Sequence, residues 1–142
     1  MTRCKMGECV WSLIIKKHIL KEHQSGKLFE VTGVEGITFD DSEFPVKHEI
    51  NFIEWYEEIY KFHVFCSAKL PTIIFELSNL VVFDFRKIPG VSVLAANLYT
   101  IACHNEPPFS WYEEEFLEKY KYRKPILEEI IIESPFDIFK YF

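Results

Sequence analysis

The chain has 142 residues, the usual size of one folded domain, and a chain of this length can bury a core without disulfide or metal support. Hydrophobic residues make up 49% and charged residues 27%, a balance that excludes a disordered protein and is typical of a soluble one. The 22 acidic residues outnumber the 16 basic ones, and Lys and Arg form no block longer than a pair. We therefore expect one globular domain over residues 1–142, with a net charge of -6 and no nucleic-acid partner.

Nothing in the chain predicts membrane association. The most apolar stretch, residues 70–85, is interrupted by Glu76 and Asp84 and is shorter than the roughly 20 residues that a helical span needs. The N-terminus lacks the cleavage site of a secretory signal. Four cysteines in a chain that can build its own core predict free thiols in a reducing compartment, so we expect a cytoplasmic protein.

The first predicted element is a strand over residues 10–23. A helix there would place Lys17 and Lys21 in the middle of its apolar arc, whereas alternation gathers large apolar side chains on one side. A turn at 24–27 and two short strands, at 28–32 and 36–40, are predicted to follow.

Residues 52–65 predict an amphipathic, largely buried helix. Asn51 and Glu54 have the spacing of a capping box, in which each side chain satisfies a backbone N–H of the first turn. On a helical wheel, the aromatic and aliphatic side chains form a wide arc opposite a narrow charged stripe.

The second half predicts a hairpin and then helices. Residues 72–77 and 80–86 are typical of paired strands around Ser78-Asn79. Residues 91–103 predict a helix buried nearly all round, and a second capping box, Ser110 with Glu113, opens a helix over 111–122. The predicted class is α+β, with N-terminal strands and a central hairpin packed against three or four amphipathic or buried helices.

Cysteine and histidine form one spacing of interest near the N-terminus. Four residues separate Cys4 from Cys9 and His18 from His23, as in a two-Cys two-His zinc finger. The middle gap has eight residues, whereas a finger needs about 12 there. We therefore expect no metal and no other cofactor, and keep a zinc-binding interaction module as an alternative.

A second set could serve a metal or a cysteine nucleophile if two predicted helices met. It comprises His63, Cys66, Cys103 and His104. The set is a weak candidate because His63 lies on the apolar arc of its helix and Cys103 on a buried one, and sequence fixes no distance between them. We predict no catalytic residue, with a small cysteine-dependent enzyme as the less favoured alternative.

The predicted helix 111–122 carries the candidate binding surface. Its core side would hold Tyr112, while Trp111 and Tyr122 fall on the opposite, charged side. Exposed aromatic rings ringed by one sign of charge are typical of hot spots for an oppositely charged partner. Alternatively, Trp111 folds back onto the core and Tyr122 packs under the C-terminal tail. The predicted partner-binding residues are Trp111, Glu114, Glu115, Glu118 and Tyr122.

These features favour a non-catalytic acidic protein-binding module. The specific hypothesis is a stoichiometric inhibitor of the immunity or antitoxin type, which masks the basic surface of a toxin or nuclease. The sequence predicts neither the identity of the partner nor the oligomeric state.

Overall fold

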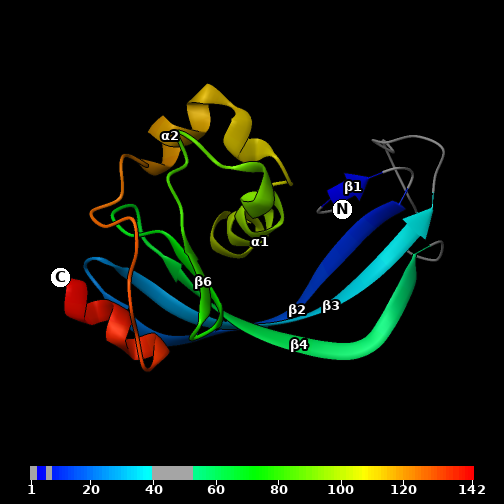
Figure 1. The fold of residues 1–142 in the computed structure, drawn as a ribbon, viewed down its shortest axis with the longest axis horizontal. Helices are drawn as coiled ribbons and strands as arrows, with labels where there is room; N and C mark the ends of the chain where they lie inside the picture. Colours follow the sequence, from blue (N-terminus) through cyan, green and yellow to red (C-terminus); the bar gives the residue numbers. More distant parts are fainter. Residues whose placement is uncertain (1–2, 6–7, 40–52) are drawn as a thin grey trace.

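The computed structural model describes residues 3–5, 8–39 and 53–142. In this part of the chain, six strands form one antiparallel sheet in which each strand pairs with its neighbours in sequence. Helices pack on the sheet, so the fold is α+β, as predicted (Figure 1). The strands are β1 (Arg3–Lys5), β2 (Glu8–His23), β3 (Gly26–Phe39), β4 (Glu54–Cys66), β5 (Thr72–Glu76) and β6 (Asn79–Val82).

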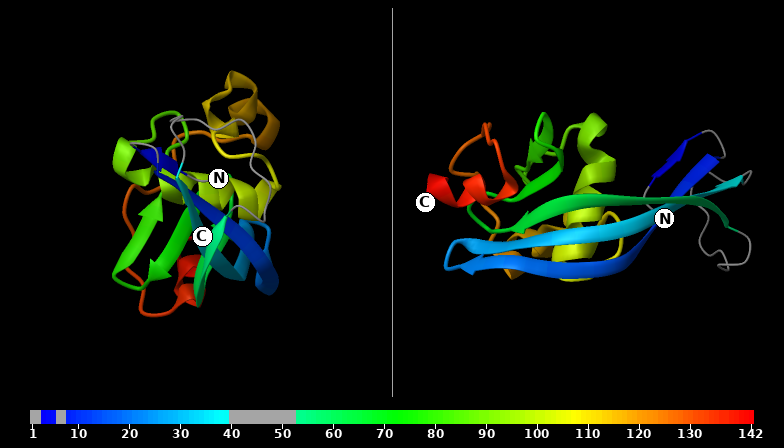
Figure 2. Two further views of the ribbon diagram at one scale, coloured as in Figure 1. Left: turned by 90° about the vertical axis from the view of Figure 1, so that its right-hand side faces the viewer. Right: turned by 90° about the horizontal axis from the view of Figure 1, so that it is seen from below.

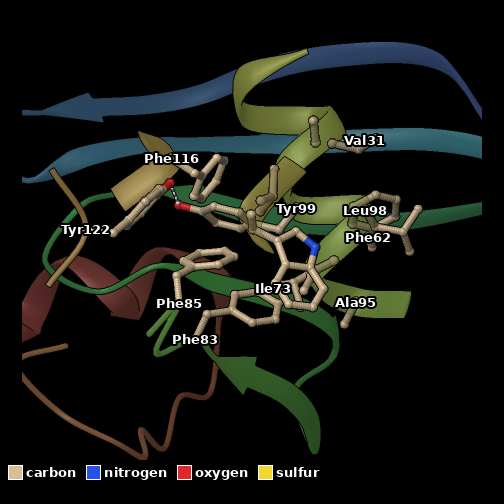
Figure 3. Packing of buried hydrophobic residues seen from close by; sticks show 14 residues of the cluster. Val31, Phe62, Ile73, Phe83, Phe85, Ala95, Leu98, Tyr99, Phe116 and Tyr122 are labelled. Atoms are coloured by element: carbon tan, nitrogen blue, oxygen red, sulfur yellow. Dashed lines mark hydrogen bonds between the residues drawn. The ribbon is translucent and has the colours of Figure 1, made fainter. Parts of the chain in front are cut away.

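The helices follow the sheet in sequence and cover parts of both its faces. Along β4, Val64 belongs to the cluster packed against α1, and the next residue, Phe65, packs against the C-terminal segment on the opposite face. Aromatic rings dominate the α1-side core (Figure 3). The helical elements are η2 (Gly90–Ser92), α1 (Val93–His104), η3 (Ser110–Tyr112), α2 (Glu114–Tyr120) and η4 (Pro135–Tyr141).

Strands β2, β3 and β4 continue past the helices as an arm (Figures 1 and 2). Leu13, Val34 and Ile59 lie opposite one another across its three strands, so their side chains share one face. Leu13 and Ile59 are exposed there. At Gly36, an added Cβ would lie 2.7 Å from the Ile53 side chain and 2.9 Å from the Glu54 carbonyl oxygen, so the close approach of two strands requires glycine.

The helix predicted over 52–65 is wrong, because Glu54–Cys66 is strand β4. A register shift explains the misleading pattern: Val34 pairs with Ile59, but Gly36 pairs with Trp55, four residues earlier. This shift breaks the alternation of β4 and leaves its apolar residues at helix-like spacing. The proposed cap residue Asn51 lies outside the described residues.

Other predictions are confirmed in part. The strand over 10–23, the hairpin and the buried helix are β2, the β5–β6 pair and α1. The two short strands predicted at 28–32 and 36–40 are one strand, β3. The capping box at Ser110 is wrong: Glu113 has an extended backbone, with φ -73° and ψ 135°, which divides the predicted helix into η3 and α2.

Candidate functional site

The structure separates the five predicted binding residues. Trp111 and Tyr122 are only 4% and 5% exposed and belong to the α1-side core, so the prediction that they form a contact surface is corrected. The break at Glu113 is the reason, because it alters the direction of the chain between the two halves of the predicted helix. The three glutamates remain exposed on α2, namely Glu114, Glu115 and Glu118.

Asn97 of α1 anchors the η3 segment. Its side-chain Oδ1 accepts a hydrogen bond from the indole N–H of Trp111 at 2.7 Å. The same oxygen accepts the backbone N–H of Phe109 at 2.8 Å. Because Asn97 and Trp111 are both buried, η3 is held on α1 by satisfied polar contacts as well as by apolar packing.

The anchored η3 segment holds the aromatic side chain of Tyr112 at the surface. Tyr112 is 66% exposed, and its ring centroid lies 4.0 Å from that of Trp111 and 6.0 Å from the stacked ring of Phe109. In the part of the chain that the structure describes, no ion pair involves the exposed glutamates that follow it. We call this surface the Tyr112 patch; it consists of Tyr112, Glu113, Glu114, Glu115 and Glu118.

A largely buried hydrogen-bond network links Tyr122, which follows α2, to Tyr99 and His104 of α1. The Tyr122 hydroxyl donates to the Tyr99 hydroxyl at 2.9 Å (Figure 3), and the Tyr99 oxygen accepts the backbone N–H of Ser67 at 3.2 Å. Nε2 of His104 lies 2.6 Å from the Tyr122 oxygen. Since Tyr122 gives its proton to Tyr99, we assign a proton to Nε2 of His104, which then donates to Tyr122.

Burial keeps this network uncharged. It raises the pKa values of Tyr99 and Tyr122 and lowers the pKa of His104 to about 4, with Lys119 and Lys17 opposing the cationic ring and Glu106 favouring it. The Tyr120 ring stacks on His104, with centroids 3.6 Å apart. The network joins Ser67, which follows β4, to α1 and to the segment that follows α2, and Tyr122 is therefore a structural residue.

The low pKa of His104 predicts acid sensitivity. Because the unfolded ring has a pKa near 6.5, the stabilisation from the neutral ring is complete above pH 6.5 and is lost as the pH falls towards 4. The full shift corresponds to about 3 kcal/mol, which solvent screening at this partly exposed ring reduces to roughly 1–2 kcal/mol. Urea unfolding of the wild type and His104→Gln between these pH values measures the effect. An equal pH dependence in both proteins would refute it.

The prediction of free thiols is wrong. Cys66 at the end of β4 and Cys103 in α1 form a disulfide with Cα atoms 5.5 Å apart. Cys9 is also disulfide-bonded, and the β1–β2 register places the backbone of Cys4 opposite it. In the second cysteine and histidine set, the sulfurs of Cys66 and Cys103 are bonded to each other and supply neither a metal ligand nor a nucleophile, while His63 lies beside Glu30 and His104 beside Tyr122.

The zinc alternative fails on geometry. Cys9, His18 and His23 lie along the single extended strand β2. At the strand rise of about 3.3 Å per residue, Cys9 is about 30 Å from His18 and about 46 Å from His23. No group of three or more potential metal ligands occurs among the described residues.

Comparison with known proteins adds no assignment. No family model, no curated protein and no solved structure matches the chain. None of the helices in residues 3–5, 8–39 and 53–142 combines the length and apolar character needed to cross a lipid bilayer.

Proposed function

We propose that the protein is a non-catalytic binding module and that the Tyr112 patch is its contact surface for a basic protein. The observation that carries the proposal is Tyr112, a large aromatic side chain that is 66% exposed on a segment anchored through Trp111 to Asn97. Aromatic anchors dominate many interfaces, and an anchor fixed before binding loses little conformational entropy on association.

The carboxylates around Tyr112 favour a positively charged partner. Glu113, Glu114, Glu115 and Glu118 lie within six residues, and the whole chain has a net charge of -6. Such a field steers a basic protein during encounter and repels acidic ones. In this proposal the protein covers the basic site of a toxin or nuclease in a one-to-one complex, as an inhibitor of the immunity or antitoxin type.

We also propose that the protein acts in an oxidising compartment. The sequence-based prediction of a cytoplasmic location rested on free thiols, but Cys66, Cys103 and Cys9 are disulfide-bonded. Structural disulfides persist mainly in oxidising environments.

Affinity capture from the native extract, at low and moderate salt, tests the proposed function. The wild type is expected to retain one basic protein, with less retained as salt rises, because ions screen exposed charges beyond about 10 Å at 0.1 M. The double variant Tyr112→Ala with Glu115→Lys is expected to retain none of it.

The arm supplies a matched control with the same change of side chains and charge. Tyr56 and Glu57 are adjacent exposed residues on β4, remote from η3 in sequence. The variant Tyr56→Ala with Glu57→Lys should retain the partner as the wild type does. Equal retention by the patch variant and the wild type, or loss in the arm variant alone, would refute the proposed surface.

A further inference from the structure

A hollow of about 430 Å³ lies between the β5–β6 hairpin and the chain segment 128–131. None of its lining residues belongs to the Tyr112 patch. Its walls include two exposed apolar side chains, Leu77 at 44% and Ile131 at 90% exposure. Leu80 and Val82 of β6 line it as well, so the outermost strand of the sheet forms one side of the hollow.

The wall opposite β6 is fixed in place. The Tyr141 hydroxyl of η4 accepts the backbone N–H of Ile131 at 2.9 Å and donates to the Ile131 carbonyl oxygen at 2.8 Å. In the described part of the chain, no backbone hydrogen bond joins β6 to this wall. The outer edge of β6 therefore has backbone groups available to a further strand.

The two long sides of the sheet differ in their capacity to accept a strand. Beyond Val10, no described strand pairs with the outer edge of β2, but that edge carries Lys16, Lys17 and Lys21 and two register shifts against β3. Lysines and bulges on an edge oppose the addition of a strand. Strand β6 has the sequence NLVV, without a charge, and no register shift within its residues 80–82.

The acidic side chains that line the hollow favour a strand with basic side chains. Glu128 and Glu129 line the hollow and are exposed, and neither forms an ion pair with any described residue. A smaller hollow of about 180 Å³ adjoins this one, and both are lined by Val82 and Glu128. The basic residue Lys87 lines the smaller hollow and not the larger one. An apolar surface beside two carboxylates matches a segment that alternates apolar and basic side chains.

We infer that this hollow binds an extended basic segment of a partner protein, which adds to the outer edge of β6. Its apolar side chains pack on Leu77, Leu80 and Ile131, and its Lys or Arg side chains pair with Glu128 and Glu129. The inference does not depend on the Tyr112 patch.

Backbone amide shifts of the isotope-labelled protein test the inference, with a short capped peptide of alternating lysine and valine as the probe. We expect shifts at Asn79–Val82 and at residues 128–131, and none from the corresponding glutamate–valine peptide. The double variant Glu128→Lys with Glu129→Lys should weaken binding about tenfold, since each reversal replaces an attraction by a repulsion. Both side chains are exposed, so the fold should persist, as dispersed amide signals would verify.

The matched control, Glu114→Lys with Glu115→Lys, makes the same charge change in the Tyr112 patch and should leave peptide affinity unchanged. Ile131→Ser should weaken binding several-fold without a change of charge. The inference is overturned if the lysine peptide shifts no residue of β6, if the glutamate peptide binds equally well, or if the control variant alone loses binding. The Tyr112 patch is tested separately, by capture of its own partner.

Discussion

Replacing both Cys66 and Cys103 by alanine is expected to lower the free energy of unfolding by about 4 kcal/mol. The disulfide joins residues 37 apart in sequence, and closing a loop of that length removes conformational entropy from the unfolded chain. It also connects the end of β4 to α1, beside the contact of Tyr99 with Ser67. Urea unfolding of the wild type and the double variant, under oxidising conditions, measures the difference.

Reductant supplies the control for this prediction. It should destabilise the wild type more than the double variant, because the wild type alone has the Cys66–Cys103 bond to lose. The bond of Cys9 remains in both proteins and is reduced in both. Equal unfolding free energies for the wild type and the double variant would contradict a stabilising link between β4 and α1.

Trp111→Ala is expected to lower the free energy of unfolding by about 3–5 kcal/mol, whereas Tyr112→Ala should cost less than about 1 kcal/mol. Trp111 is 4% exposed, so its truncation opens a cavity in the core and removes an indole donor from Asn97. Tyr112 is 66% exposed and loses mainly contacts with other rings. Thermal and urea unfolding of the two single variants provide the comparison.

This adjacent pair also separates stability from binding. Tyr112→Ala should lose partner capture while remaining folded, and Trp111→Ala should lose stability first. Small and equal losses of stability in the two variants would contradict the burial of Trp111. They would instead agree with the helix predicted from the sequence over 111–122, in which Trp111 lies at the surface.

Much of the fold follows from local patterns that the structure leaves intact. The lysines that excluded a helix over 10–23 are accommodated in β2 by packing on aromatic faces. The Lys17 ammonium lies 4.6 Å from the Phe29 ring centroid and donates to the Ala102 carbonyl oxygen, and Lys21 lies 4.7 Å from the Phe139 ring centroid. Helix α1 was predictable because its apolar residues leave no polar face.

The failures arise where distant contacts override a local pattern. The pairing of Gly36 with Trp55 imposes strand structure on β4 although its apolar residues have helical spacing. The extended backbone of Glu113 carries no sequence signal, and the hydrogen bonds of Asn97 to Trp111 and Phe109 support it across more than ten residues. Sequence pattern therefore predicted that the glutamates of α2 are exposed, but it placed the buried Trp111 and Tyr122 beside them and the exposed Tyr112 on the core side.

The pairing of Cys66 with Cys103 was beyond prediction for a related reason. Cys103 was assigned to a helix and Cys66 to the position just after another, and the bond depends on β4 being a strand whose last residue reaches α1. Composition alone favoured free thiols because the chain is long enough to fold without a disulfide.

Calorimetric titration of the captured basic partner into three forms of the protein tests the central claim most directly. The wild type should bind at one to one. Tyr112→Ala with Glu115→Lys should weaken the affinity by at least about 30-fold, corresponding to a hot-spot loss of about 2 kcal/mol. The matched arm variant, Tyr56→Ala with Glu57→Lys, should stay within about threefold of the wild type. Unchanged affinity in the patch variant, together with a native unfolding transition, would contradict the assignment of the Tyr112 patch as the binding surface.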